Sequence, residues 1–529
     1  MFFFYLKSLV LLLVSGIVYG NISSWIRWRR LRQWGKQYGC GEAPKQLNKL
    51  PWGVEKVWFM INNIKGLDFL EYIRGRYVNM QCYTYRIHGL FFNSMVTTSD
   101  PENIQAILAT KFPDYDLGPA RNDAFYELLG NGIFTAEGKS WSHFRQQLRP
   151  QFTRDQVSDL EAAEHHLNVL FKALPEENAS GWVENADWLP LLYRFTLDTS
   201  TEFLFGRSVN SQSTALHASD SGYSAEEQEN LAFAKAMTDA QEYVVSRLHF
   251  RIMAYFPMSK AYKKSCATVK AMADRFVKRA VESSHERKEE PIDGEKRKFV
   301  LLDALVAETK DPIELRDQTL HILLAGRDTT SSLLGWTILL LARHPEAFQK
   351  LRRAVMEQFG SETRPTTREL NFASLKACKE MTHVLYETLR LYPIVPINGR
   401  LATRNTVLPT GGGPDRKQPI AIRKGEPVGY SAYVMHRRRD LWGEDADDFK
   451  PDRWEGRKLG WEFVGFSGGP RVCIGQQYAL NEASFFMVRV LQRYDVIEAL
   501  DMTGPLKKGL TITLQPGDGV KVRMHRASS

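Results

Sequence analysis

The 529-residue sequence predicts a mainly α-helical protein with small β-sheets. Most of the chain repeats its apolar residues with the period of a helix. Alternating or β-rich patterns are confined to short stretches such as residues 82–98, 401–434 and 509–525. A hydrophobic content of 43% and an aromatic content of 12% are enough to bury a large core, so the composition excludes a disordered chain.

The first element is an apolar segment followed directly by arginines. The stretch "MFFFYLKSLVLLLVSGIVYG" contains one charge, Lys7, and residues 8–26 approach the roughly 20 apolar residues that span a bilayer. The positive charges behind it favour a cytosolic position for the rest of the chain. We therefore expect a transmembrane helix at 1–26, a basic, proline-containing linker at 27–50 and one domain at 51–529. A cleaved signal peptide is the alternative.

Cysteine usage and charge narrow the function classes. The five cysteines are odd in number and widely separated, which argues against a disulfide framework and for a reducing compartment. The net charge of +9 comes from dispersed basic residues, so no nucleic-acid-binding stripe is predicted. A basic docking face for an acidic partner protein stays compatible with this charge.

A long helix is predicted from Asp311-Pro312 to about Arg343, because aspartate is a good N-cap and proline suits the first helical position. Its interior, 321–342, is apolar on nearly every face, yet the polar group 327–330 lies in the middle. Gly326 weakens the helix by about 1 kcal/mol relative to alanine. We interpret this as a notch for a small ligand and water; the alternative is that "DTT" caps a second helix.

A second helix is predicted over 372–393. Glu387 and Arg390 are three residues apart and share one of its faces. By itself the pattern is weak, because it also occurs at 71–74, where an exposed ion pair explains it.

Cys473 lies in "FSGGPRVCIG", residues 466–475. A buried anionic sulfur is a strong ligand for iron or zinc, but zinc requires further cysteine or histidine ligands and none stands nearby. Haem requires a single protein ligand. The glycines at 468, 469 and 475 would let the backbone lie against a planar macrocycle. The alternative is a glycine-rich turn with a buried thiol.

The neighbours of Cys473 suit the same interpretation. The segment that follows is amphipathic, and the N-terminus of such a helix is expected to lower the pKa of the thiol. Phe466 could shield the sulfur from water, and Arg471 could pair with a haem propionate.

Together these motifs resemble a known family. Phe466-x-x-Gly469-x-Arg471-x-Cys473-x-Gly475 resembles the haem-binding signature of the cytochrome P-450 superfamily, and further motifs are similar in order and spacing. They are Trp141-x-x-x-Arg145, Ala325-Gly326-x-Asp328-Thr329-Thr330, Glu387-x-x-Arg390 and "FKPDRW" with Arg453. The resemblance covers the chain from about residue 50 to its end. "GRDTTSSLLGW" and the stretch 433–454 are similar to a fungal branch whose members often hydroxylate alkanes and fatty acids.

The resemblance implies a cytochrome P-450 fold and a membrane-bound haem-thiolate monooxygenase. Such an enzyme inserts one atom of O2 into an unactivated C–H bond of an apolar substrate, here a long-chain alkane or fatty acid. A fungal secondary-metabolite scaffold is the alternative substrate, and a non-catalytic haem-binding membrane protein is the alternative class. The implied cofactor is haem b, with NADPH and flavins acting through NADPH-cytochrome P-450 reductase. Cytochrome b5 is a further candidate partner, and the implied location is the endoplasmic reticulum membrane, with a single span and a cytosolic catalytic domain.

The resemblance also implies residue roles. Cys473 is the axial iron ligand, Thr329 hydrogen-bonds dioxygen and Asp328 relays protons. Further residues are implied in cofactor binding, namely Phe466, Gly469 and Gly475, with Trp141, Arg145, Arg400 and Arg471 as propionate candidates. A surface or sheet-edge arginine is the alternative for Arg400. Glu387, Arg390 and Arg453 are implied to hold the fold on the cysteine side.

The substrate pocket is expected to be apolar. Its implied lining is the loop 116–134, the helix residues Leu324, Ala325 and Thr329, and the segments 394–399 and 507–514. Arg327 interrupts this apolar character. It is expected either to face away from the haem or to hold a substrate carboxylate.

Overall fold

The computed structural model describes residues 2–46, 58, 68–88, 94–153, 160–217, 222–249, 257–286 and 299–528. The chain divides into two compact units, each assembled from three separate segments. Unit 1 consists of Met1–Gly118, Pro396–Ala446 and Leu459–Val472, and unit 2 of Pro119–Val395, Asp447–Lys458 and Cys473–Ser529.

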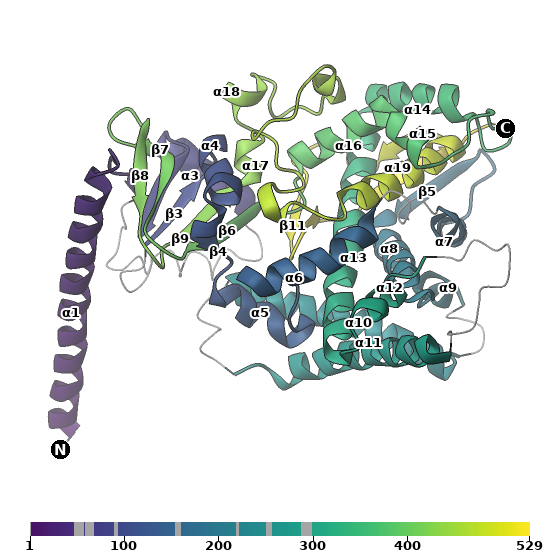
Figure 1. Ribbon diagram of the computed structural model, residues 1–529. Coiled ribbons are helices and arrows are strands. Elements are labelled where there is room, and N and C mark those ends of the chain that lie inside the picture. Colours follow the sequence, from purple (N-terminus) through teal and green to yellow (C-terminus); the bar gives the residue numbers. More distant parts are fainter. Residues whose placement is uncertain are drawn as a thin grey trace. The chain divides into compact units, whose positions relative to one another are not determined.

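Unit 1 is built on a mixed sheet (Figure 1). The described strands run in the order β1 (Lys45–Gln46), β2 (Thr84–His88), β3 (Ser94–Thr98), β9 (Pro427–Ser431), β6 (Ile397–Ala402) and β4 (Tyr115–Asp116). A separate hairpin pairs β7 (Thr406–Gly412) with β8 (Gln418–Ile422). The helices are α1 (Phe2–Lys36), α3 (Phe69–Met80), α4 (Pro101–Gln105), α17 (Ala432–Met435) and α18 (Arg439–Trp442). The core of this unit includes Val96, Ile104 and Val428.

Helix α1 does not end where the predicted anchor ends. It continues without interruption to Lys36, through ten residues of the predicted linker. Its last turns pack on unit 1: Leu31 is buried, and the Trp28 ring centroid lies 4.4 Å from the Arg86 guanidinium. Contacts with strand β2 therefore stabilise helix where charge and composition predicted a linker.

The transmembrane helix predicted for 1–26 is not found. Among the helices that the structure describes, none is long and apolar enough to cross a bilayer. The side chains of most of residues 1–17 lie outside the description, as do residues 47–50 of the predicted linker.

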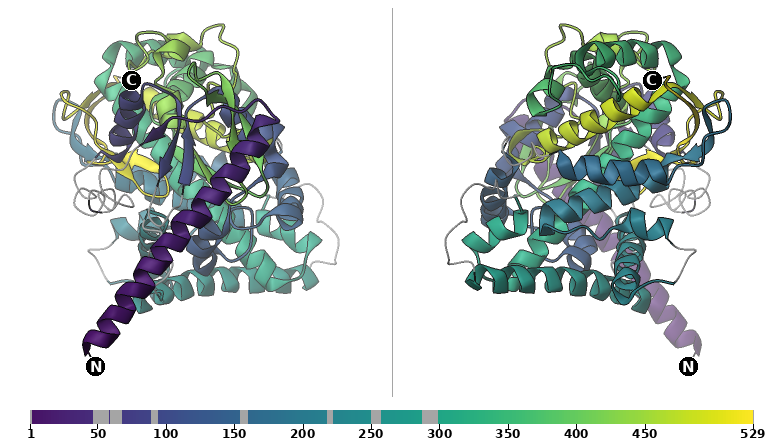
Figure 2. Two further views of the ribbon diagram at one scale, coloured as in Figure 1. Left: turned by 90° about the vertical axis from the view of Figure 1, so that its left-hand side faces the viewer. Right: turned by 90° about the vertical axis from the view of Figure 1, so that its right-hand side faces the viewer.

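Unit 2 is mainly helical. Its longer described helices are α5 (Pro119–Leu129), α6 (Gly138–Leu148), α7 (Glu161–Lys172), α8 (Trp188–Phe205), α10 (Ala225–His249), α11 (Lys260–Glu286), α13 (Pro312–Arg343), α14 (Pro345–Phe359), α16 (Lys379–Leu391) and α19 (Gln476–Arg493). The shorter ones are α9 (Ser211–Leu216), α12 (Leu301–Glu308) and α15 (Phe372–Ala377). One small sheet joins β10 (Tyr494–Ala499), β13 (Lys521–Arg526) and β5 (Trp182–Asp187), and the yellow C-terminal strands run beside the blue β5 in Figure 2. Strands β11 (Lys508–Leu510) and β12 (Leu514–Pro516) form the other.

Helix α13 confirms the predicted bounds. The Asp311 side chain accepts the Ile313 N–H at 2.9 Å, and the helix is continuous to Arg343, so a second helix capped by "DTT" is wrong. Helix α8 packs closely against Gly326. A Cβ at this position would lie 2.9 Å from the Ser200 Oγ, so the packing favours glycine here although glycine weakens a helix.

The helix predicted over 372–393 is instead two helices. They are separated at Cys378, whose backbone is extended (φ −77°, ψ 93°). The first, α15, is nucleated by a capping box between Asn371 and Ser374, which closes a short helix locally.

Candidate functional site

The middle of α13 presents an accessible face within a buried helix. Ala325, Gly326 and Thr329 are partly exposed, whereas the residues on both sides are buried. The Thr329 hydroxyl donates to the Ala325 carbonyl at 2.5 Å, one turn earlier. Its oxygen can still accept a hydrogen bond, so this face offers an oriented hydroxyl to a small ligand.

Asp328 is buried next to that face. Its Oδ1 lies 3.4 Å from the Arg327 Nη1 and makes no hydrogen bond to a described residue. Burial raises the pKa of Asp328, while Arg327 and Gln241 act in the opposite direction. A buried carboxyl group with a raised pKa can hold and transfer a proton.

Arg327 points toward α10. Its Nη2 donates to the Thr238 hydroxyl at 3.1 Å and its Nη1 to the Gln241 Oε1 at 3.4 Å. Its guanidinium also lies 5.3 Å from the Tyr193 ring centroid, on α8. The Arg327 side chain is therefore held by residues of α10 and lies against Tyr193 of α8.

Cys473 lies three residues before α19. The residue is accessible, but protein surrounds the thiol densely enough that burial raises its pKa. The Gly475 N–H and the Arg145 guanidinium act in the opposite direction and are outweighed. The N–H at the helix N-terminus therefore lowers the thiol pKa as expected, but in the protein alone burial has the larger effect.

Helix α6 carries Trp141 and Arg145 one turn apart. Trp141 is buried, and the Arg145 guanidinium lies 5.8 Å from its ring centroid. Burial lowers the pKa of Arg145, and the Cys473 sulfur opposes this shift. The structure thus brings these two predicted residues together and places Arg145 within electrostatic reach of Cys473.

The glycines around Cys473 differ in why the structure requires glycine at each position. Gly469 has φ +65°, and a Cβ there would lie 1.9 Å from the Leu108 carbonyl oxygen. A Cβ at Gly468 would lie 2.6 Å from the Trp461 ring, whereas at Gly475 the nearest atom, in Phe152, is 3.7 Å away. Close approach to other parts of the chain therefore already requires glycine at 468 and 469, without the planar group that we invoked for them.

Arg400 is a buried residue of strand β6, 6% exposed, so the surface alternative is wrong. Its Nη1 donates to the Gly399 carbonyl at 2.7 Å. Its Nε is buried without a hydrogen-bond partner among the described residues. Such a donor suits an acidic group of a bound ligand. Phe466 and Arg471, also in unit 1, are partly exposed.

The fully buried Glu387 is the centre of a polar cluster in unit 2. Both of its oxygens accept from Arg390 at 2.8 Å, and Oε1 also accepts from the Arg453 Nε at 2.9 Å. The Lys450 N–H and the Trp454 Nε1 add bonds at 2.9 and 3.0 Å. The structure thus brings the predicted three residues together. It adds Trp454, which the sequence analysis missed although it ends the motif "FKPDRW".

Glu482 on α19 was also missed. Its carboxyl group is buried near the hydroxyls of Thr199, Thr330 and Tyr478, and burial raises its pKa to about 7. One of its oxygens has no hydrogen-bond partner among the described residues. The one charged residue in "ALNEASFF" was the available signal.

Two side chains of α13 hold the loop 130–135. The Asp317 Oδ2 accepts the Asn131 N–H at 2.8 Å, and the His321 Nδ1 accepts the Phe134 N–H at 3.3 Å. A Cβ at either glycine of this loop, 130 or 132, would lie within 2.4 Å of these side chains. Burial lowers the pKa of His321 to about 3, so the ring is neutral and can accept. The loop belongs to the predicted substrate pocket.

Comparison with known proteins decides the family. The family model described as Cytochrome P450 matches residues 53–521. The chain belongs to the cytochrome P450 family. Similar proteins include Cytochrome P450 monooxygenase g430 of Fusarium sp, 44% identical over 98% of this chain and 90% of that protein. Cytochrome P450 52A13 of Debaryomyces hansenii is 40% identical over 92% of each. Among solved structures, the cytochrome P450DA heme domain has a TM-score of 0.72 at 19% identity, covering 92% of this chain and 98% of its own, which shows the fold.

This P450 is therefore a monooxygenase, an oxidoreductase whose family implies a haem iron and a reductase as redox partner. Three observations fit a haem. The Cys473 residue is accessible beside Arg145, the buried Arg400 Nε has no partner among the described residues, and Thr329 lies on an accessible helix face.

Proposed function

We propose that this P450 inserts one atom of O2 into a C–H bond of a long-chain alkane or fatty acid. The carrying observation is the accessible face of α13 with Thr329, in a helix whose neighbouring turns belong to a large apolar cluster. That cluster contains Phe125, Leu128, Leu320, Leu323 and Leu324. A polar group would be costly to bury in such surroundings, which favours a substrate without polar groups near the reacting carbon.

The residues of the chain would divide the work as follows. When bound, haem would supply the activation of O2 with electrons from the reductase. Cys473 would ligate its iron, and Asp328 would hold the proton to be transferred. Thr329 would redirect its hydroxyl proton from the Ala325 carbonyl to form a hydrogen bond with dioxygen. The remaining candidates would bind or enclose the macrocycle, namely Trp141, Arg145, Arg400, Phe466, Gly469, Arg471 and Gly475.

The environment of Arg327 bears on the substrate class. Its Nη1 and Nη2 are engaged by Gln241 and Thr238, whereas its Nε is buried without a hydrogen-bond partner among the described residues. A substrate carboxylate would therefore compete with the existing contacts of this guanidinium, including the one with Asp328. Alkanes and fatty acids would then differ little in binding, and chain length would decide affinity.

The test is reconstitution of the full-length protein with NADPH-cytochrome P450 reductase. We expect NADPH-dependent terminal hydroxylation of lauric acid and of hexadecane, and a long-wavelength Soret band in the reduced, carbon-monoxide-bound protein that Cys473→Ala abolishes. Absence of product with every acyl chain and alkane would reject the substrate class. An unchanged band in Cys473→Ala would show that Cys473 does not ligate the haem iron.

A fungal secondary-metabolite scaffold is the second candidate substrate. Hydroxylation of a polycyclic or polyketide scaffold with no turnover of lauric acid or hexadecane would select this candidate.

We further propose attachment to the endoplasmic reticulum membrane through residues 1–26, with the catalytic domain in the cytosol. Support comes from the apolar residues of that segment and the arginines behind it. Carbonate extraction of cell membranes tests the proposal. The full chain should stay in the pellet, and deletion of residues 2–26 should release it.

A further inference from the structure

Unit 1 contains a cavity that the proposed function does not use. Its volume is about 510 Å³, and it lies between the end of α3, strand β2, the β7–β8 hairpin and the residues around α17 and α18. That volume falls in the range of small-molecule sites. Its charged lining consists of Arg74, Arg416, Arg437, Arg438 and Arg439 with a single carboxylate, Asp100. We call it the arginine pocket.

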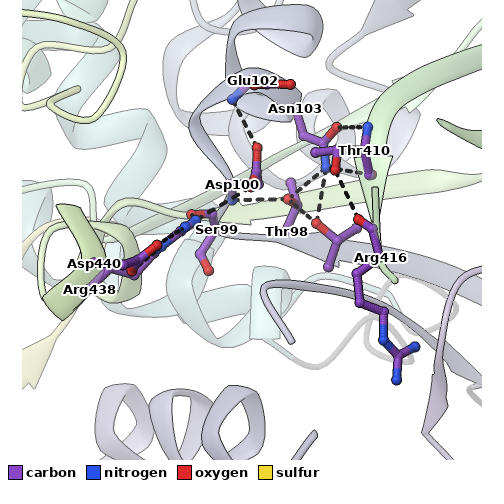
Figure 3. A network of polar contacts seen from close by, with 10 residues as sticks. Thr98, Ser99, Asp100, Glu102, Asn103, Thr410, Arg416, Arg438 and Asp440 are labelled. Atoms are coloured by element: carbon purple, nitrogen blue, oxygen red, sulfur yellow. Dashed lines mark hydrogen bonds and ion pairs between the residues drawn. The ribbon is translucent and has the colours of Figure 1, made fainter. Parts of the chain in front are cut away.

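The floor of the pocket is fixed by Arg438. The Asp440 carboxylate binds its Nε at 3.1 Å and its Nη2 at 2.5 Å, and the Ser99 carbonyl accepts from Nη1 at 3.1 Å (Figure 3). Its guanidinium also lies 3.6 Å from the Tyr83 ring centroid. This arginine is fully engaged, so it shapes the pocket and its charge is largely neutralised by Asp440 and Asp100.

The hairpin wall is held by hydrogen bonds to α4. The buried Asn103 side chain donates to the Thr410 carbonyl at 3.0 Å and accepts the Thr410 N–H at 3.1 Å. The Thr410 hydroxyl in turn donates to the Arg416 carbonyl at 3.0 Å. These bonds keep Arg416 in a left-handed conformation (φ 63°), which ordinary residues rarely adopt.

The Arg416 side chain is exposed at the tip of this hairpin. Figure 3 shows its guanidinium extended away from Thr410 and Asn103. It forms no ion pair with any residue that the structure describes. An anchored backbone with an uncommitted cation at its end provides a charged contact that a ligand can recruit.

A second cation lies deeper. Arg437 is 7% exposed, and its guanidinium stacks 3.8 Å from the Tyr433 ring centroid. Its Nη1 donates to the Tyr433 carbonyl at 3.5 Å, so the side chain is held by its neighbours and contributes a fixed positive charge to the pocket wall. Arg439 lies at the rim, where its bond to Glu444 joins two exposed side chains and is weak.

We propose that the arginine pocket binds the phosphate group of a small phosphorylated ligand or of a phospholipid headgroup, with Arg416 as the charged contact and Arg437 as a fixed positive charge in the wall. The volume exceeds what an inorganic ion fills. Tyr77, Val78 and Val434 supply an apolar wall for the body of the ligand. Neither the family membership nor the proposed oxidation uses this site.

Binding is tested on the purified full-length protein with two probes. The first is inorganic phosphate in calorimetric titration. The second is sedimentation with phosphatidylcholine vesicles, with and without phosphatidylinositol 4-phosphate, so that any contribution of residues 1–26 cancels. We expect saturable binding in at least one arm. Binding only to the phosphoinositide vesicles identifies a headgroup, and binding of free phosphate identifies a soluble ligand.

The variants decide whether the pocket is responsible. Arg416→Gln removes the exposed cation and should weaken binding about tenfold, and Arg416→Lys should restore part of it. Lys417→Gln removes the neighbouring charge, which does not line the pocket, and should leave binding unchanged. Absence of saturable binding in both arms overturns the proposal, as does equal weakening by the glutamine variants at 416 and 417.

Discussion

Glu387 shows how one buried charge depends on its partners. Its carboxylate is fully buried and accepts from Arg390, Arg453, Trp454 and a backbone N–H. Glu387→Gln would leave two buried guanidinium groups without a counter-charge. We expect a loss of about 3 to 5 kcal/mol in the free energy of unfolding, and weaker haem retention, measured by urea titration and by the Soret-to-280-nm absorbance ratio.

Glu380 gives the matched control, because it lies on the same helix and no ion pair with a described residue involves it. Glu380→Gln should change the free energy of unfolding by less than about 0.5 kcal/mol. Similar losses in both variants would contradict the role of the buried network.

Glu482 predicts a pH dependence. Burial raises its pKa from an ordinary 4.5 to about 7, so the folded state holds its proton more tightly than the unfolded state. The associated stability is fully present below pH 4.5 and is lost as the pH rises to about 7, by about 3 kcal/mol in total. Glu482→Gln has no such loss. Urea unfolding at pH 5 and pH 8 measures this. From pH 5 to pH 8 the free energy of unfolding of the variant should rise relative to that of the wild type. The same pH dependence in both proteins would contradict the assignment.

Sequence analysis predicted the roles of some of these residues and missed others for a physical reason. Glu387 and Arg390 are three apart on one helix, so local spacing predicts that they can meet. Trp454 comes from a segment more than sixty residues away, and only the fold brings its indole to the carboxylate. The orientation of Arg327 was left open for a related reason: spacing places it on α13 but does not show that Thr238 and Gln241 engage it.

At the scale of elements, the crossing of α13 and α8 depends on Gly326. A Cβ there would lie 2.9 Å from the Ser200 Oγ and 3.8 Å from its Cβ. Overpacking costs about 1 to 3 kcal/mol, and alanine returns about 1 kcal/mol of helix propensity, so Gly326→Ala should lower the free energy of unfolding by up to about 2 kcal/mol. Adding Ser200→Ala removes the close atom and should recover most of the loss in a double-mutant cycle. Additive effects of the two changes would contradict this packing.

The loop 130–135 gives a prediction that depends on the proposed function. His321→Leu removes the acceptor of the Phe134 N–H, whereas His321→Asn keeps a nearby oxygen acceptor. Because the loop would line the substrate pocket, the leucine variant should bind lauric acid about tenfold more weakly, and asparagine should recover part of the affinity. Spectral titration measures both. Equal affinities in the wild type and the leucine variant would show that this loop does not shape the pocket.

Some helix ends have a local cause in the sequence, and others depend on contacts with distant parts of the chain. The ends of α13 follow from Asp311, Pro312 and a long apolar interior, and the sequence predicted them. The continuation of α1 past residue 26 is supported by Leu31 and Trp28 packing on unit 1, which no local pattern contains. The break at Cys378 was missed because the flanking residues keep helical spacing through it.

At the scale of the whole molecule, each compact unit is assembled from three segments, with residues near 118 and 396 joining one unit. Periodicity and composition describe stretches of a few tens of residues, so they predicted the helical class and the small sheets. They carry no information about which distant segments fold together, and the division of the chain into two units was not predicted.

The net charge of +9 also belongs to the whole molecule, and it predicts how the protein meets its reductase. If the reductase presents an acidic surface, the opposite charges accelerate encounter, and salt screens this attraction over a Debye length of about 10 Å at 0.1 M. The association rate constant should therefore fall about tenfold between 50 and 500 mM NaCl, while the dissociation rate constant changes little. Biolayer interferometry with immobilised reductase measures both rates. An association rate independent of salt would show that charge does not steer this encounter.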